Sequence, residues 1–152
     1  MKKFELTSEF ITNIFGTKLF RIKALIEFGN VKAGELGGFV EKEENLSQDG
    51  NAWVYDNARV YGDACVYGDA RVCGDARVCG DAGYATVHGF GSEYRTTTFF
   101  KTKAGVGVKC GCFYGNLSEF RKKVVETHGE TKKAKEYLML ADLMEFRFSD
   151  NS

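Results

Sequence analysis

The centre of the chain repeats its hydrophobic and polar positions every six residues. From about residue 46 to 87 the hexads read QDGNAW, VYDNAR, VYGDAC, VYGDAR, VCGDAR and VCGDAG. A period of six fits neither the 3.6-residue turn of an α-helix nor the two-residue alternation of a strand. The pattern therefore predicts another regular structure, in which successive hexads stack.

Two apolar series within the hexads are expected to point inward. They are Val54, Val60, Val66, Val72 and Val78, and Ala52, Ala58, Ala64, Ala70, Ala76 and Ala82. A β-branched valine packs well on a strand, while alanine fits where the chain turns a narrow corner. Gly-Asp and Asn-containing pairs tolerate the turns between them. The pattern predicts a tightly wound β-solenoid, and the alternative is a series of hairpins with a fortuitous period. It resembles the hexapeptide repeat of left-handed parallel β-helices, and this resemblance implies about three hexads, or about 18 residues, per coil.

The flanks of the repeats predict two further segments. The stretch KLFRIKALIEF alternates well enough for a strand, which indicates an N-terminal β segment over residues 1–45, before a solenoid over 46–90. Residues 91–152 predict a ββαα module: a hairpin turning at 103–105, a helix capped by Asn116 and ended by Gly129, and a second helix from Thr131. This module would cap the open end of the solenoid or serve assembly.

The apolar positions of the two predicted helices mark their buried faces. In the first helix these positions are Leu117, Phe120, Val124 and Val125. In the second they are Ala134, Tyr137, Leu138, Ala141 and either Leu143 or Met144. The spacing of both sets is helical, so each helix is expected to bury one side.

Charge and cysteine content narrow the function classes. Lysine plus arginine and aspartate plus glutamate both number 21, so no overall field attracts a long nucleic acid or a membrane surface. No run of 18 apolar residues and no apolar leader is present, which favours a cytoplasmic protein. The five cysteines lack the paired spacing of a zinc site, so we expect free thiols and no metal.

The stretch ELGGFVEKEENLSQDGNAWVYDNARVYGDA resembles the core of small hexapeptide-repeat proteins of phages and prophages, which are often labelled hexapeptide transferases. The resemblance covers about residues 18 to 90, and the tail FFKTKAGVGVKCGCFYGNLSEFRKKVVETHG resembles a module that often accompanies them. It implies a mainly β chain with a short left-handed parallel β-helix, in the cytoplasm of a bacterial host cell. It also implies a homotrimer with ligand clefts between subunits.

An enzymatic hypothesis rests on one histidine. Hexapeptide acyltransferases usually carry a histidine general base, and His88 in TVHGFGSEY is the candidate here. His128 in ETHGE stands at a helix end, where it favours the helix dipole and is expected to be structural. No inserted loop interrupts the hexads, and about three coils offer little surface for binding a molecule as long as coenzyme A. We therefore expect no cofactor and favour a non-enzymatic role.

A binding hypothesis rests on arginines at equivalent positions of successive coils. A coil of 18 residues stacks Arg59 on Arg77, with Arg95 next in that series, and Trp53 on Arg71. Stacked guanidiniums repel each other unless an anion or a carboxylate lies between them. The predicted ligand-binding residues are Arg59, Arg71, Arg77, Arg95, Trp53, Tyr94, Lys101, Lys103 and Lys109. The alternative is neutralisation within the chain by Asp63, Asp69, Asp75 and Asp81.

Three functions remain open from the sequence. The leading hypothesis is non-enzymatic capture of a small anionic, nucleotide-like ligand, such as a signal made by bacterial defence systems. The second is an acyltransferase that uses His88. The third is a structural or protein-interaction module of a phage particle.

Overall fold

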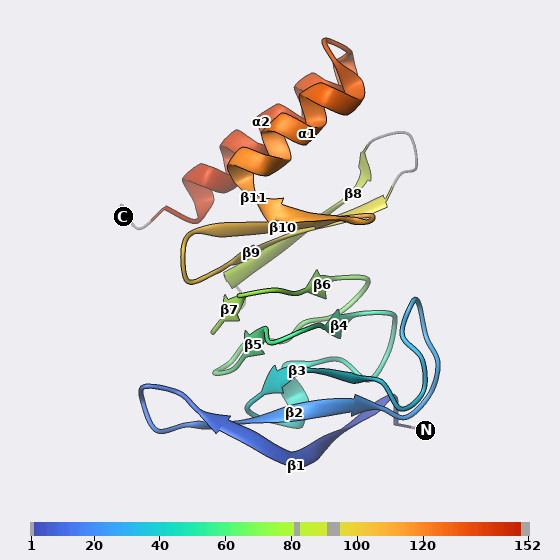
Figure 1. The fold of residues 1–152 in the computed structure, drawn as a ribbon, viewed down its shortest axis with the longest axis vertical. Coiled ribbons are helices and arrows are strands. Elements are labelled where there is room, and N and C mark those ends of the chain that lie inside the picture. Colours follow the sequence, from blue (N-terminus) through green and yellow to red (C-terminus); the bar gives the residue numbers. More distant parts are fainter. Residues whose placement is uncertain (1, 81–82, 91–94, 150–152) are drawn as a thin grey trace.

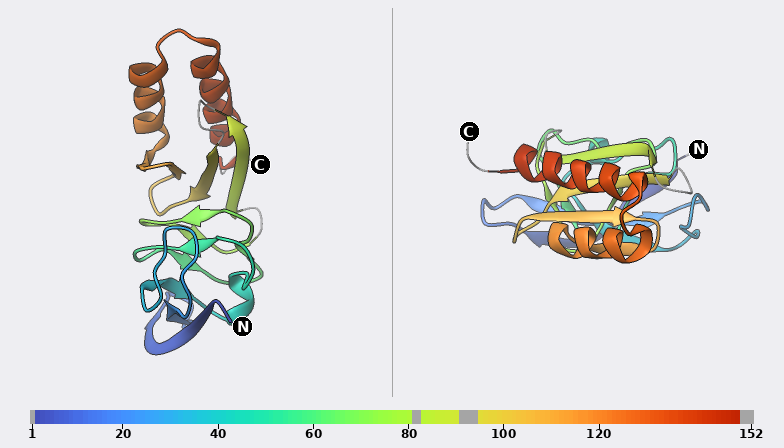
Figure 2. Two further views of the ribbon diagram at one scale, coloured as in Figure 1. Left: turned by 90° about the vertical axis from the view of Figure 1, so that its right-hand side faces the viewer. Right: turned by 90° about the horizontal axis from the view of Figure 1, so that it is seen from above.

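The computed structural model describes residues 2–80, 83–90 and 95–149. From one end to the other, it places the N-terminal strands, the repeats, a C-terminal sheet and two helices in succession (Figure 1). The side view in Figure 2 shows the two helices next to each other beyond the C-terminal sheet. The repeats therefore lie in the middle of the molecule, with folded structure on both sides of them.

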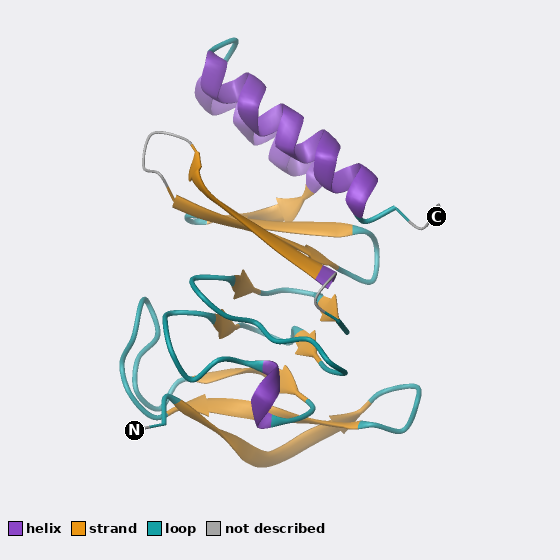
Figure 3. Ribbon diagram, turned by 180° about the vertical axis from the view of Figure 1, so that it is seen from behind, coloured by secondary structure: helices purple, strands orange, loops and turns teal. Residues whose placement is uncertain are grey.

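The N-terminal sheet continues into the repeats. Strands β1 (Phe4–Thr12), β2 (Lys18–Ala24) and β3 (Leu36–Val40) are antiparallel neighbours, and β3 then pairs in parallel with β5 (Arg59–Val60). The strand predicted in KLFRIKALIEF is therefore confirmed as β2. In Figure 3 the short 3-10 helix η1 (Glu43–Asn45) lies on the side that faces the viewer. Its last residue, Asn45, is buried, and its Nδ2 donates to the carbonyl of Ala64 at 2.8 Å.

The repeats pair in parallel at a spacing of 18 residues. Strand β5 pairs with β7 (Arg77–Val78), and β4 (Trp53–Val54) pairs with β6 (Arg71–Val72). All the predicted inward valines, and all the predicted alanines that the structure describes, are buried. Ala82 lies outside the described residues. The predicted stacking of Arg59 on Arg77 and of Trp53 on Arg71 is therefore confirmed.

The predicted fold class, however, is wrong. The chain is mainly β, but among the described residues the strands form three separate sheets of five, four and two strands. Within this part of the chain, no continuous solenoid sheet winds through the repeats. A left-handed parallel β-helix is therefore not the fold. The turn in each hexad ends the extended backbone after two residues, and between 61 and 70 only the isolated bridge from Leu46 to Val66 forms. On both sides of the repeats, longer antiparallel strands supply most of the backbone pairing, as in β1 with β2 and β8 with β9.

The C-terminal part is a four-stranded antiparallel sheet under two helices. The sheet order is β11 (Phe113–Asn116), β10 (Val106–Cys110), β9 (Arg95–Lys101) and β8 (Tyr84–Phe90). The predicted hairpin is confirmed as β9 and β10, while β8 arises from residues that the hexad pattern assigned to the solenoid. No helix among the described residues has the length and apolarity to cross a membrane.

Both predicted helices form. Helix α1 (Leu117–His128) is capped by Asn116, whose Oδ1 accepts from the Glu119 backbone N–H at 2.8 Å, and α2 (Lys132–Arg147) is capped by Thr131. Their buried faces pack on Phe99 and Val108 of the sheet. Val125 and Leu143 were expected in these faces but are exposed, so Met144 is the buried choice at the end of α2.

The opposite face of the C-terminal sheet rests on the repeats. The Arg71 backbone N–H donates to Thr98 Oγ1 at 3.0 Å, and the Tyr84 hydroxyl donates to the carbonyl of Cys65 at 2.8 Å. A bridge between Ala76 and Thr102 adds backbone pairing at the same junction. These contacts fix the C-terminal sheet against the last repeats and define the cavities between them.

The contact of β3 with the repeats gives a stability prediction. A Cβ on Gly38 would lie 2.5 Å from the Ala58 carbonyl oxygen and 2.7 Å from Val54 Cγ1, whereas a Cβ on Gly80 meets nothing within 4 Å. Gly38→Ala should therefore destabilise the fold by about 1 to 3 kcal/mol through overpacking, which lowers the Tm by roughly 3 to 10 °C. Gly80→Ala is the matched control for calorimetry, and equal melting temperatures would contradict this packing.

Candidate functional site

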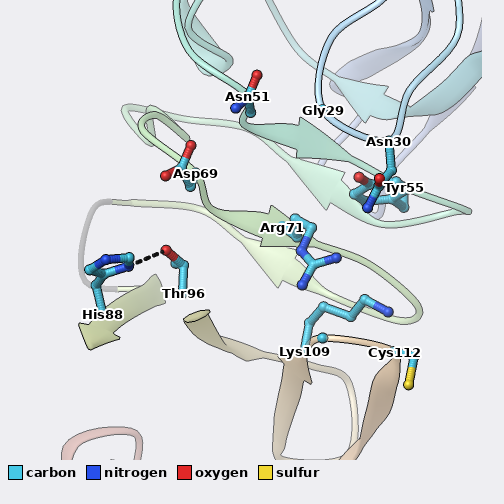
Figure 4. A pocket seen from close by; sticks show the side chains of 11 residues that line it. Gly29, Asn30, Asn51, Tyr55, Asp69, Arg71, His88, Thr96, Lys109 and Cys112 are labelled. Carbon is cyan, nitrogen blue, oxygen red and sulfur yellow. Dashed lines mark hydrogen bonds between the residues drawn. The ribbon is translucent and has the colours of Figure 1, made fainter. Parts of the chain in front are cut away.

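A cavity of about 760 Å³ lies between the repeats and the C-terminal sheet. The repeats supply Asn51, Tyr55, Asp69 and Arg71, and the C-terminal sheet supplies His88, Thr96 and Lys109. Gly29, Asn30, Gly111 and Cys112 complete the wall. A single chain forms this site, which lies where the two parts of the fold meet (Figure 4).

One end of the cavity is cationic. Arg71 must point outward from β6 because the next residue, Val72, occupies the core. Lys109 likewise alternates with the buried Val108 on β10, and in Figure 4 the two cationic side chains extend toward each other. Within the described residues, neither Arg71 nor Lys109 forms an ion pair with a carboxylate. Two cations that have no ion-pair partner among the described residues therefore face the same cavity.

A smaller cavity of about 310 Å³ adjoins this cationic end. It shares Asn30, Tyr55, Arg71 and Lys109 with the larger cavity. Burial raises the pKa of Tyr55, and the charge of Arg71 opposes that rise. Tyr55 is therefore a neutral phenol at physiological pH, so it can donate a hydrogen bond to an anion beside Arg71.

The only carboxylate in the wall of the smaller cavity, among the described residues, is that of Asp56. Its Oδ2 accepts a hydrogen bond from the Gly74 backbone N–H at 3.2 Å. The Asp56 backbone has a φ of 56°, in the left-handed region that an Asp side chain tolerates better than a bulkier one. Asp56 therefore supports the turn that carries Gly74.

The other end of the cavity holds a histidine. His88 on β8 is the register partner of Thr96 on β9, and its Nδ1 lies 3.0 Å from Thr96 Oγ1. In the tautomer whose Nδ1–H donates to Thr96, Nε2 keeps a lone pair and can accept a proton. Asp69 and Asn51 line the same cavity and could orient a polar group of a ligand. The arrangement can therefore bind an anion at one end and accept a proton at the other.

The predicted binding residues divide between two places. Arg71 and Lys109 meet His88 in the larger cavity, whereas Arg77, Lys101 and Lys103 line a separate cavity of about 450 Å³. Arg59 stacks beside Arg77 in the parallel ladder.

Two of the other three predicted residues, Trp53 and Arg95, lie elsewhere, and the third falls outside the described residues. Trp53 is fully buried and packs edge-on against Phe4 and Phe28, so it lines none of these cavities. Arg95 does not continue the parallel register of Arg59 and Arg77, because β9 is antiparallel to β8 and the backbone of Arg95 pairs with that of Phe90. Tyr94 lies outside the described residues.

The sequence left open whether aspartates neutralise the arginines. Within the described residues, Asp63, Asp69 and Asp75 form no ion pair with an arginine, and Asp81 lies outside that range. His128, expected to be structural, ends α1 and stacks on Tyr137 with ring centroids 5.8 Å apart. The part of the chain that the structure describes contains no cluster of His, Cys, Asp or Glu suited to a metal ion.

Several residues of the site were missed from the sequence. Asn51 and Asp69 are 18 residues apart, and the Asn51 backbone N–H donates to the Gly68 carbonyl at 3.1 Å. They therefore follow the register that stacks Trp53 on Arg71, and this register could have revealed them. Asn30 and Thr96 come from segments without repeats, so no comparable signal marked them.

Comparison with known proteins gives one partial similarity. No protein-family model matches the chain. An alignment over 63 residues, which covers 37% of this chain, is 40% identical to the uncharacterized acetyltransferase YdcK of Escherichia coli (strain K12). The chain spans 19% of the length of that relative. The similarity thus connects part of the chain with an acetyltransferase, while the phage resemblance stays a prediction.

The cysteines around the site should differ sharply in reactivity. Burial raises the pKa of Cys73 to about 12 despite the nearby charge of Lys109, whereas Cys79 and Cys112 are exposed. At pH 8 the thiolate fraction of Cys73 should be about 10³-fold lower than that of a cysteine with an ordinary pKa of about 8.5. Alkylation followed by peptide mass spectrometry should show fast labelling of Cys79 and Cys112, and fast labelling of Cys73 would contradict the packing.

Proposed function

We propose that this chain binds a small anionic ligand in the cavity between the repeats and the C-terminal sheet. The observation that carries the proposal is the pair Arg71 and Lys109, which face one cavity without an ion-pair partner among the described residues. A guanidinium offers a planar donor fork for phosphate or carboxylate, and an ammonium adds a compact charge.

The surroundings of the two cations favour a polar ligand of small size. The neutral phenol of Tyr55 and the amide of Asn30 lie beside Arg71 and supply uncharged hydrogen-bonding groups. Asp69, Asn51 and His88 supply acceptors and donors away from the cationic end. A molecule with an anionic group at one end and hydroxyl or amino groups at the other matches this distribution.

The proposal predicts how single substitutions change binding. Arg71→Gln and Lys109→Gln should each weaken ligand binding about 10- to 100-fold, because each removes a charge-assisted hydrogen bond worth roughly 1.5 to 3 kcal/mol. Titration calorimetry with phosphate, pyrophosphate, cyclic and linear nucleotides and acetyl-coenzyme A would measure the effect. Lys122→Gln is the matched control, because Lys122 is exposed on α1 and lines neither cationic cavity.

A ligand retained from the cell can be identified in the same preparation. Heating should release it into the supernatant, where mass spectrometry gives its mass and charge. Less released ligand from Arg71→Gln than from Lys122→Gln would support the site. Equal amounts from both variants, with unchanged affinities, would exclude this cavity.

The second candidate function is acyl transfer. Two observations favour it: His88 lies in the same cavity as the cations, and part of the chain is similar to an acetyltransferase. In that reaction His88 Nε2 would take the proton from an acceptor hydroxyl or amine as the acceptor attacks the carbonyl carbon of an acyl thioester, and Thr96 would fix the tautomer. The C–S bond would then break, and the departing thiolate would take the proton from His88 and leave as a thiol. Arg71 and Lys109 would then hold an anionic part of a substrate.

The role of His88 separates the two functions. With acetyl-coenzyme A and a panel of amine and sugar acceptors, His88→Gln should lower turnover about 10²- to 10⁴-fold if the histidine is a general base, with binding largely kept. If the unaltered chain forms no acylated product, and if His88→Gln binds the anion as well as the unaltered chain does, then binding alone is the function.

Three expectations from the sequence stay predictions. They are capture of a nucleotide-like defence signal, a homotrimer, and a role in a phage particle. The nucleotides in the binding panel address the first. Light scattering addresses the second, because a trimer should give about three times the mass of the chain.

A further inference from the structure

A second cationic cavity lies on another side of the repeats. Its volume is about 450 Å³, and Arg77, Lys101 and Lys103 line it together with the hydroxyl-bearing Tyr61 and Thr102. In Figure 1 the loop between β9 and β10 extends on the side of β7, and the bridge between Ala76 and Thr102 fixes this loop to the repeats. The cavity thus joins a repeat strand and a C-terminal loop that are distant in sequence.

The arginines beside this cavity are forced together by the core. Val60 and Val78 are fully buried register partners, so the preceding residues, Arg59 and Arg77, must both lie on the outer face. Parallel pairing places the two residues at strand spacing, roughly 4.8 Å apart. Burial lowers the pKa of Arg59, and the like charge of Arg77 lowers it further.

The described residues offer Arg59 and Arg77 few hydrogen-bond or ion-pair partners. Within the described residues, no ion pair joins Arg59, Arg77 or Lys103 to a carboxylate. Arg77 Nη1 donates long bonds to the backbone oxygens of Asp75 at 3.5 Å and Ala76 at 3.4 Å. The Nε of Arg59 is buried and has no hydrogen-bond partner. Arg59, the register partner of Arg77, therefore carries an unmet donor beside a like charge, although it does not itself line the cavity.

We propose that this cavity is a second anion site, which binds a multivalent phosphate such as a diphosphate or a phosphate monoester. A single carboxylate would neutralise one of several cations, whereas a phosphate group brings more charge and several acceptor oxygens. The hydroxyls of Tyr61 and Thr102 can donate to the remaining oxygens. This site does not depend on the proposed function, because Arg71 and Lys109 line the other cavity.

A small phosphate fits this cavity better than a nucleic acid does. Phe148, at the end of α2, and the loop of residues 102–105 bound it, so few phosphates of a long strand could reach Arg77. The chain as a whole has a formal net charge of zero, and strong binding of a long strand needs many phosphate contacts.

Two exposed cysteines allow each cavity to be followed separately. Cys79 lines the second cavity and Cys112 lines the larger one. Pyrophosphate, at an ionic strength held constant with sodium chloride, should slow alkylation of Cys79 in a saturable way. Protection of Cys112 alone, or protection of Cys79 equalled by chloride, would overturn the proposal. Stronger protection of Cys79 by a single-stranded oligonucleotide than by pyrophosphate would overturn the preference for a small anion.

Variants test which side chains hold the phosphate. Arg77→Gln and Lys103→Gln should each weaken the pyrophosphate protection of Cys79 about tenfold or more, whereas Arg71→Gln and Lys122→Gln should leave it unchanged. Equal protection in all four variants would contradict the site. Loss in Arg71→Gln alone would assign the effect to the other cavity.

Thermal stability gives a readout that does not depend on labelling. Without phosphate, Arg77→Gln should raise the Tm, because it removes the repulsion of Arg59 while Val78 keeps the core filled. Pyrophosphate should raise the Tm of the unaltered chain and have less effect on this variant. A variant that is less stable than the unaltered chain, yet responds equally to pyrophosphate, would contradict the proposal.

Discussion

The parallel stacking of hexads around buried valines and alanines is the constraint on which the rest of the molecule depends. Val60 and Val78 are fully buried register partners, as are Val54 and Val72, and each pair fixes the direction of the residue before it. Since successive residues of a strand point to opposite sides, the core decides which charged side chains lie next to each other outside. Arg59 and Arg77 are neighbours for this reason rather than through any attraction of their own.

The C-terminal sheet covers part of this outer surface, and cavities lie between the two. Its contacts through Thr98 and Thr102 fix it to the last repeats, so that Lys109 faces Arg71 on one side and Lys103 joins Arg77 on the other. Repeats alone would present arginines to open solvent, where water and salt screen them. In a cavity, Arg71 and Arg77 are screened less by water and salt. Because neither forms an ion pair with a carboxylate among the described residues, each can attract an anionic ligand more strongly there.

How far the sequence predicts this structure depends on which interactions are local. The 18-residue register, the buried Val66 and Ala70, and the caps Asn116 and Thr131 follow from short patterns, and the structure confirms them. The way in which the strands are divided among sheets does not follow from these short patterns. A period of six residues specifies stacking but not the length of each strand. It also gives no sign of the antiparallel strands β1 and β8, each of which is an edge strand of one of the two larger sheets. The burial of Trp53 depends on Phe4 and Phe28, which no repeat contains.

The functional question turns on which end of the larger cavity determines its chemistry. A general base needs an acceptor held within hydrogen-bond reach and an acyl donor positioned against it, so His88 alone does not make a transferase. The cations need only a ligand of opposite charge, and Arg71 and Lys109 both line the wall of one cavity. Binding is therefore the simpler function to derive from the chain. Acyl transfer would also use His88 at the other end of the same cavity, so both functions would share the anion contact of Arg71 and Lys109.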